Sequence, residues 1–126
     1  GREARWTAEP ETDGERMLAL SWYLALMTAT CLDLTGGAGP VIVEGPFAGN
    51  PDFLSMLAAA TGRAVETSSG ATGTASGAAL LACPGAELGA TRPASEPEAR
   101  LRDHALRWRE AVRNAVPEDG VGCLRI

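Results

Sequence analysis

The longest apolar stretch of the chain covers residues 17–34, where Asp33 is the only charged residue. Thr12 and Glu15 stand before it at the spacing of a capping box, so we expect a helix from about residue 13 to about residue 35. Apolar residues occupy nearly every face of this helix, which predicts that protein covers most of it. The stretch approaches membrane-span length, but its hydroxyl residues and Asp33 favour a buried core helix over a span.

A second pattern follows, in which a short β-branched run leads into a glycine loop and then into an apolar helix. Val41–Val43 predicts a buried strand, and Gly45–Gly49 forms the loop. Asn50 is a good N-cap for a helix over 51–61, which the next glycine closes in the left-handed conformation. Residues 64–67 predict a second strand, parallel to the first through a βαβ crossover.

The remainder predicts two further helices. Residues 72–83 are rich in glycine and alanine, which indicates a helix packed closely against another backbone, and residues 87–94 are expected to be loop. Ser95 and Glu98 match a second capping box, before an amphipathic helix that Pro117 ends. Residues 1–11 are expected to be a loop or a join, and residues 118–126 a frayed tail.

The fold class is therefore α/β, with short parallel-type strands between helices, in one domain or a piece of one. Two short strands and four helices are too few for a stable sheet. We expect this chain to be the back half of a larger α/β domain, with further strands supplied by another segment.

Charge and composition argue against several classes of function. The net charge of −5 argues against non-specific binding to nucleic acid or to an anionic membrane. The chain has no lysine, which excludes a lysine-based phosphate loop within it. Three cysteines are too few for a zinc site, and Cys31 and Cys83 are expected to be buried thiols. We find no signal peptide, and a cytoplasmic protein is expected.

Few residues carry candidate chemistry. His104 stands among charged residues without a ligand partner at metal spacing, so we expect a solvated position and no metal site. Trp22 and Trp108 are expected to fill a core. Phe47 is either a core anchor or a ring that stacks near a base, with the core favoured. The loop itself is where α/β proteins hold phosphates and nucleotides, or else a plain strand-to-helix turn.

Residues 39–82 resemble the C-terminal domain of the FGGY carbohydrate kinases, which share the actin-like, ribonuclease H-like ATPase fold. The similarity lies in an apolar strand that enters a glycine loop, in the helix end Thr61-Gly62-Arg63-Ala64-Val65, and in the small-residue helix Gly77-Ala78-Ala79-Leu80-Leu81-Ala82. The resemblance covers about a third of the chain. Within the family, the Gly-Pro-Phe sequence of this loop resembles that of the L-fuculokinase-like or other deoxysugar kinases.

The resemblance implies transfer of the γ-phosphoryl group of ATP to a sugar hydroxyl, with Mg²⁺ held mainly outside this chain. It implies that the loop lines part of the ATP wall, through Gly45, Pro46, Phe47, Ala48 and Asn50. The catalytic base of the family lies upstream, so no catalytic residue is expected here, and the chain alone is expected to phosphorylate no sugar. The position of that base is matched by none of the aspartates of this chain, which are Asp13, Asp33, Asp52, Asp103 and Asp119.

The implied partners are a sugar, ATP and the rest of the kinase chain, with a homodimer as an added alternative. Pro46 departs from the second loop glycine of the family and has no N–H to offer a phosphate. The acid that usually precedes the small-residue helix is also missing. Pro46 favours one alternative, a non-catalytic actin-like lobe or assembly domain that no longer binds ATP. A further alternative is an unrelated βαβ small-molecule binder.

Overall fold

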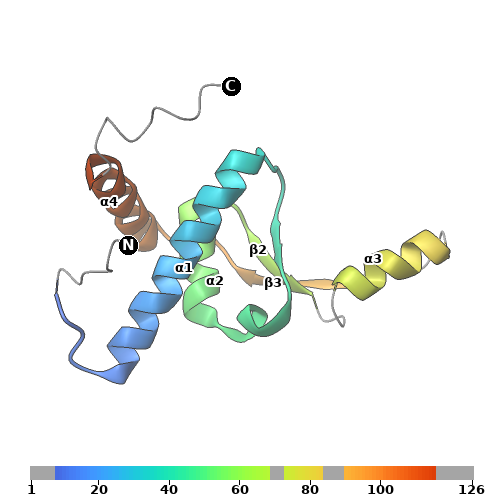
Figure 1. The fold of residues 1–126 in the computed structure, drawn as a ribbon, viewed down its shortest axis with the longest axis horizontal. Coiled ribbons are helices and arrows are strands. Elements are labelled where there is room, and N and C mark those ends of the chain that lie inside the picture. The colour runs from blue at the N-terminus through green and yellow to red at the C-terminus, as the bar shows by residue number, and fades with distance from the viewer. Residues whose placement is uncertain (1–7, 69–72, 84–89, 116–126) are drawn as a thin grey trace.

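The computed structural model describes residues 8–68, 73–83 and 90–115 (Figure 1). The predicted tail 118–126 and most of the predicted join 1–11 lie outside the described residues. The described elements follow one another in this order: α1 (Asp13–Thr35), β1 (Val41–Val43), the 3₁₀ turn η1 (Gly45–Gly49), α2 (Pro51–Thr61), β2 (Val65–Ser68), α3 (Gly73–Ala82), β3 (Thr91–Ser95) and α4 (Ala99–Ala115).

The predicted start of α1 is confirmed in detail. The hydroxyl of Thr12 accepts a hydrogen bond from the backbone N–H of Glu15 at 3.2 Å, and the carboxylate of Glu15 accepts one from the N–H of Thr12 at 3.4 Å. This capping box satisfies N–H groups that have no partner inside the helix. Gly36 ends the helix at φ 65°, a left-handed conformation that favours glycine.

The strands form one mixed sheet in the order β1-β2-β3, which confirms an α/β fold. β1 and β2 are parallel, as the βαβ pattern predicts. In this pairing Val41 lies opposite Val65. The third strand was not expected. β3 is antiparallel to β2 and occupies residues predicted to be loop. Its Pro93 is tolerated because β3 lies at the edge of the sheet.

The second predicted capping box is wrong. Ser95 lies in β3, opposite Val65, and α4 begins only at Ala99. The backbone carbonyl of Glu98 accepts a hydrogen bond from the N–H of Arg102 at 3.0 Å, which is the first turn of that helix. A strand pairing along β2 has overridden a local helix-start signal.

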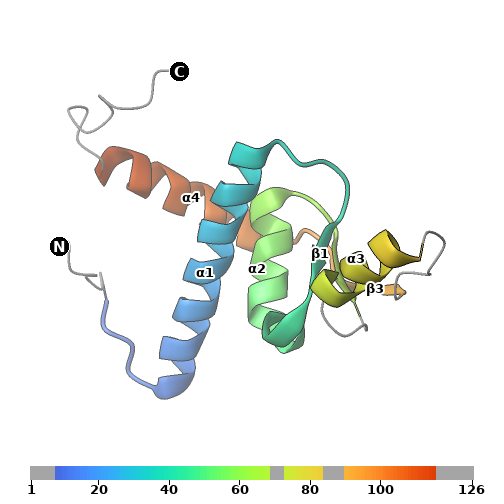
Figure 2. The ribbon, with the colours of Figure 1, turned by 45° about the vertical axis from the view of Figure 1, so that its right-hand side comes forward.

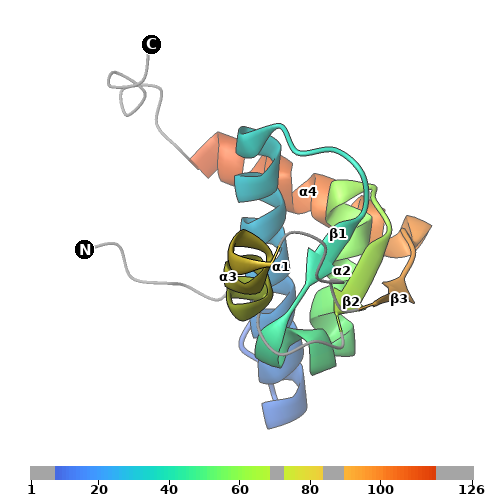
Figure 3. The same cartoon turned by 90° about the vertical axis from the view of Figure 1, so that its right-hand side faces the viewer.

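The elements stack in layers around α2 (Figures 2 and 3). α2 packs against α1 on one side, against α4 on another, and against the sheet. Met56 and Leu57 of α2 are fully buried at the centre. The buried apolar core comprises Ala25, Leu26, Ala29, Val41, Phe53, Leu54, Met56, Leu57, Ala58, Val65 and Ala105.

Only one face of α1 is buried in this chain, and this corrects the expectation of a helix covered on most sides. The face toward α2 carries its four buried residues, Ser21, Ala25, Leu26 and Ala29. On the other side lies an exposed apolar stripe, spaced three and four residues apart: Met17, Leu20, Leu24, Met27, Cys31 and Leu34. α1 is the one described helix that is long and apolar enough to cross a membrane, by length and composition only.

Two further expectations of burial are wrong. Cys31 and Cys83 are both exposed, because an apolar run does not reveal which of its positions face the core. The described part of α3 packs closely against no other described element, and Leu81 is 89% exposed. α3 projects away from the rest of the molecule (Figure 1).

Candidate functional site

The predicted loop is a one-turn 3₁₀ helix, η1, between the carboxyl end of β1 and the amino end of α2. Gly45 has φ 74°, a conformation that costs other residues free energy, and Pro46 provides the fixed φ of the first helical position. Gly45, Pro46, Phe47 and Gly49 are exposed, and Ala48 is half-buried. The chain therefore presents this backbone on its surface.

The space beside the loop glycines is open. A Cβ atom built on Gly45 or on Gly49 meets no other atom within 4 Å. The N–H of Asn50 bonds the carbonyl of Phe47 at 3.1 Å, and Pro46 has no N–H. The backbone is therefore unobstructed at these two glycines, but the loop supplies fewer donors than a loop of two glycines would.

Both polar atoms of the Asn50 side-chain amide form hydrogen bonds within the protein. Its Oδ1 accepts a hydrogen bond from the N–H of Phe53 at 3.0 Å, which confirms the predicted N-cap. Its Nδ2 donates to the hydroxyl of Ser21, a buried residue of α1, at 3.0 Å. Asn50 therefore fixes the start of α2 and ties α2 to α1, and the sequence offered no signal for this second bond.

The ring of Phe47 is anchored on one side, in line with the favoured core role, and its stacking near a base stays a prediction. It lies 4.8 Å from the ring of Phe53, centroid to centroid, with the planes tilted by 43°. Phe53 is buried in the core, whereas Phe47 remains 43% exposed. One side of Phe47 is thus anchored, and an apolar surface remains available next to η1.

The acidic residues do not gather at the loop. Asp13 and Asp52 lie in the first turns of α1 and α2, where a carboxylate complements the helix dipole. Asp33 forms an ion pair with Arg109 at 2.7 Å. No three His, Cys, Asp or Glu residues come together among the described residues, and Asp119 lies outside them.

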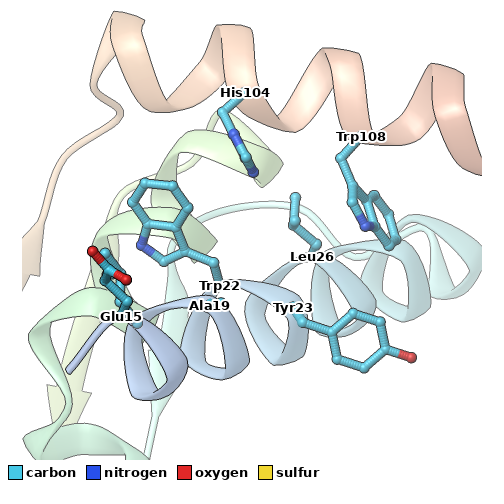
Figure 4. A pocket seen from close by; sticks show the side chains of 8 residues that line it. Glu15, Ala19, Trp22, Tyr23, Leu26, His104 and Trp108 are labelled. Atoms are coloured by element: carbon cyan, nitrogen blue, oxygen red, sulfur yellow. The ribbon is translucent and has the colours of Figure 1, made fainter. Parts of the chain in front are cut away.

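A pocket that the sequence did not predict lies between α1 and α4 (Figure 4). It has a volume of about 290 Å³, and its walls are mainly apolar and aromatic. The lining residues are Glu15, Leu18, Ala19, Trp22, Tyr23, Leu26, His104 and Trp108. Both tryptophans pack against the edge of the core and are only half-buried, so their predicted core role is confirmed in part.

His104 is half-buried, and its predicted solvated position is corrected. Its ring meets Trp22 edge-on at a centroid distance of 4.9 Å. Partial burial lowers the pKa of His104, and the positive charge of Arg107 lowers the pKa further. His104 is therefore a neutral packing residue near neutral pH.

The comparisons with known proteins agree with this geometry. Residues 1–92 match the family model of the carbohydrate kinase FGGY, C-terminal domain. The chain is also similar to a carbohydrate kinase from Novosphingobium aromaticivorans, with 33% identity and a TM-score of 0.73. That match covers 86% of this chain and 24% of the solved kinase. None of the curated proteins matches significantly.

The matched region includes the strand, the loop and the helix that carried the resemblance in the sequence. It begins well before them, since it also takes in α1. The chain corresponds to about a quarter of the length of the solved kinase. We conclude that the chain belongs to the FGGY carbohydrate kinase family, as part of its C-terminal domain.

Proposed function

We propose that this chain is the nucleotide-side part of an ATP-dependent carbohydrate kinase and that η1 forms one wall of the ATP site. The position of η1 supports this proposal most directly. It follows the carboxyl end of a parallel strand and precedes a helix N-terminus, where open α/β sheets bind ligands. The exposed backbone around Gly45 and Gly49 allows close approach of a nucleoside.

In this proposal Gly45, Pro46, Phe47, Ala48 and Asn50 line the nucleotide, and the chain holds no catalytic base. Asn50 contributes mainly by fixing the loop, because its amide already bonds Phe53 and Ser21. Phe47 offers the exposed part of its ring. When bound, ATP with Mg²⁺ supplies the γ-phosphoryl group, and the rest of the kinase supplies the sugar site and the base.

An equilibrium titration with ATP and Mg²⁺ tests the proposal on this chain and on its Gly49→Glu variant. A Cβ atom at position 49 meets no other atom within 4 Å, so we expect the variant to fold. The new carboxylate would occupy the space beside the loop and repel the phosphates of the nucleotide. Leu106→Glu adds the same charge on α4, away from η1, and serves as the matched control. We expect saturable binding that Gly49→Glu abolishes and Leu106→Glu retains.

Pro46 supports one competing function, a non-catalytic lobe that no longer binds ATP. It removes a backbone donor from the loop, and η1 keeps fewer N–H groups for a phosphate. This alternative predicts no saturable binding of ATP to the chain or to the whole kinase. The absence of binding in both would favour it over the proposed function.

A further inference from the structure

The pocket between α1 and α4 is distinct from the loop to which the proposed function assigns the nucleotide. Its walls come from these two helices, and η1 contributes no residue to it. The family model matches residues 1–92, so it ends before α4 begins at Ala99. One wall of the pocket therefore lies outside the region that shows the family, and its ligand has to be inferred from its own chemistry.

Aromatic rings from both helices line this pocket. Trp22 belongs to α1 and Trp108 to α4, and the ring of His104 meets Trp22 edge-on (Figure 4). Both indole side chains are half-buried, so each keeps part of its surface for a ligand. The face of an indole attracts a cation more strongly than the face of any other aromatic side chain.

The charge of the pocket is negative. Glu15 is the only acidic residue among those that line it, and the backbone N–H groups of Glu11 and Thr12 hold its Oε2 at 2.7 and 3.4 Å. His104 adds no positive charge near neutral pH, because partial burial and Arg107 lower its pKa. No described arginine lines the pocket and the chain has no lysine, so these rings lack a cation from the chain itself.

The neighbouring hollow on α4 does not reverse this charge. It shares Trp22 and His104 with the pocket. Its charged side chains are two acids and two arginines, whose formal charges cancel: Glu98, Asp103, Arg100 and Arg107. Glu15 therefore decides the sign of the charge that a ligand meets in the pocket, and a cation is favoured.

The size and the few polar groups of the pocket narrow the kind of cation. Its volume of about 290 Å³ is near the lower end of small-molecule pockets, so the ligand is small. Glu15 and Tyr23 carry the only side-chain oxygen atoms of the lining. A primary ammonium group has three N–H donors, and burying them without acceptors costs free energy. A quaternary ammonium group has no N–H and avoids this cost.

We propose that the pocket between α1 and α4 binds a small, free quaternary ammonium compound such as choline, with its cation between Trp22 and Trp108 and close to the carboxylate of Glu15. The inference is independent of the proposed function, because it requires neither ATP nor η1. A nucleotide is a poor ligand here, since Glu15 repels its phosphates. The headgroup of a choline lipid is disfavoured for the same reason, because its phosphate lies next to the cation.

A titration of the ¹⁵N-labelled chain with choline, at constant ionic strength, tests the proposal through the indole N–H signals of Trp22 and Trp108. The control ligand is 3,3-dimethylbutan-1-ol, which has the shape of choline with carbon in place of nitrogen. We expect saturable shifts with choline, at a dissociation constant on the order of 1 mM, and about tenfold weaker binding of the uncharged alcohol. Equal affinities, or no saturable shift at either indole, would overturn the proposal.

Glu15→Gln removes the charge of the pocket and keeps the helix start, because glutamine also serves in a capping box. We expect it to weaken choline about threefold and to leave the affinity for the uncharged alcohol unchanged. Glu110→Gln removes the same charge from an exposed position of α4 that does not line the pocket, and it should leave both affinities unchanged. Equal effects of the two variants on choline would overturn the proposal, since only net charge would then matter.

Trp108→Leu tests the wall that α4 provides. Leucine keeps an apolar side chain beside the core but has no aromatic face for a cation. We expect choline to bind about tenfold more weakly, as followed at the indole of Trp22. Unchanged affinity in a variant that circular dichroism shows to be folded would overturn the proposal, and the comparison at Glu15 decides the matter if the variant does not fold.

Two further ligands test the rival classes. Ethanolamine replaces the three methyl groups of choline by N–H donors, and binding as tight as that of choline would assign the pocket to primary amines and overturn the proposal. Phosphocholine adds the phosphate of a lipid headgroup, and binding tighter than that of choline would have the same consequence. Weaker binding of both supports the proposal. A chain that binds choline in this way but binds no ATP supports it while the proposed function fails.

Discussion

Replacing Asn50 tests how the two helices around η1 are joined. In the structure its amide caps α2 through Phe53 and reaches the buried hydroxyl of Ser21 in α1. An N-cap is worth about 1 kcal/mol, and a neutral hydrogen bond to a buried group about 1 kcal/mol more. Asn50→Ala is therefore expected to lower the free energy of unfolding by about 2 kcal/mol.

A second variant separates the two contributions. Asn50→Ser keeps a good N-cap but is too short to reach Ser21, so it is expected to cost about 1 kcal/mol. In a Ser21→Ala background the bond between the helices is already absent. Asn50→Ala should then cost only the cap, again about 1 kcal/mol, which corresponds to a coupling energy of about 1 kcal/mol.

Urea unfolding followed by circular dichroism measures these differences in free energy. The same series separates a structural role of Asn50 from a role in nucleotide binding, because the unfolding free energies are measured without ligand. A coupling energy near zero between positions 21 and 50 would refute the reasoning. Equal costs for Asn50→Ser and Asn50→Ala would refute it as well.

Three further predictions concern the contacts around α4. Gly62→Ala is expected to cost about 1 kcal/mol in urea unfolding, because φ is 68° and the new Cβ lies 2.9 Å from the side chain of Arg102; little change would contradict this. Asp33→Asn is expected to cost less than about 1 kcal/mol, and less still in 1 M salt, since the pair with Arg109 is partly exposed; a cost that salt does not change would contradict it. The lowered pKa of His104 means that the unfolded chain binds the proton more readily, so stability falls as the pH drops below about 6.5, and His104→Gln should flatten this profile in thermal melts.

The sequence predicted the elements whose signals are local. Capping residues such as Thr12 and Asn50 mark the helix starts, and Gly62 marks a helix end, because each acts on backbone groups within four residues of itself. The parallel pairing of β1 with β2 followed from the βαβ pattern. These are features that a single segment determines without the rest of the fold.

The features that were missed depend on distant parts of the chain. β3 pairs along β2 despite Pro93, and only the neighbouring strand makes that segment extended. The pocket between α1 and α4 requires Trp22 and His104, 82 positions apart in the sequence, to meet at one place. The exposure of Cys31 was missed because an almost uniformly apolar helix gives no indication of which face packs on α2.

The central claim is that the backbone of η1 is a wall of the nucleotide site. Amide chemical shifts of the ¹⁵N-labelled chain, followed as ATP and Mg²⁺ are added, test it most directly. We expect saturable shifts at Gly45, Phe47, Ala48 and Gly49, with a dissociation constant on the order of 1 mM, because one wall alone holds the ligand weakly. Shifts that are absent from these four amides, or that gather instead around the pocket between α1 and α4, would contradict the account.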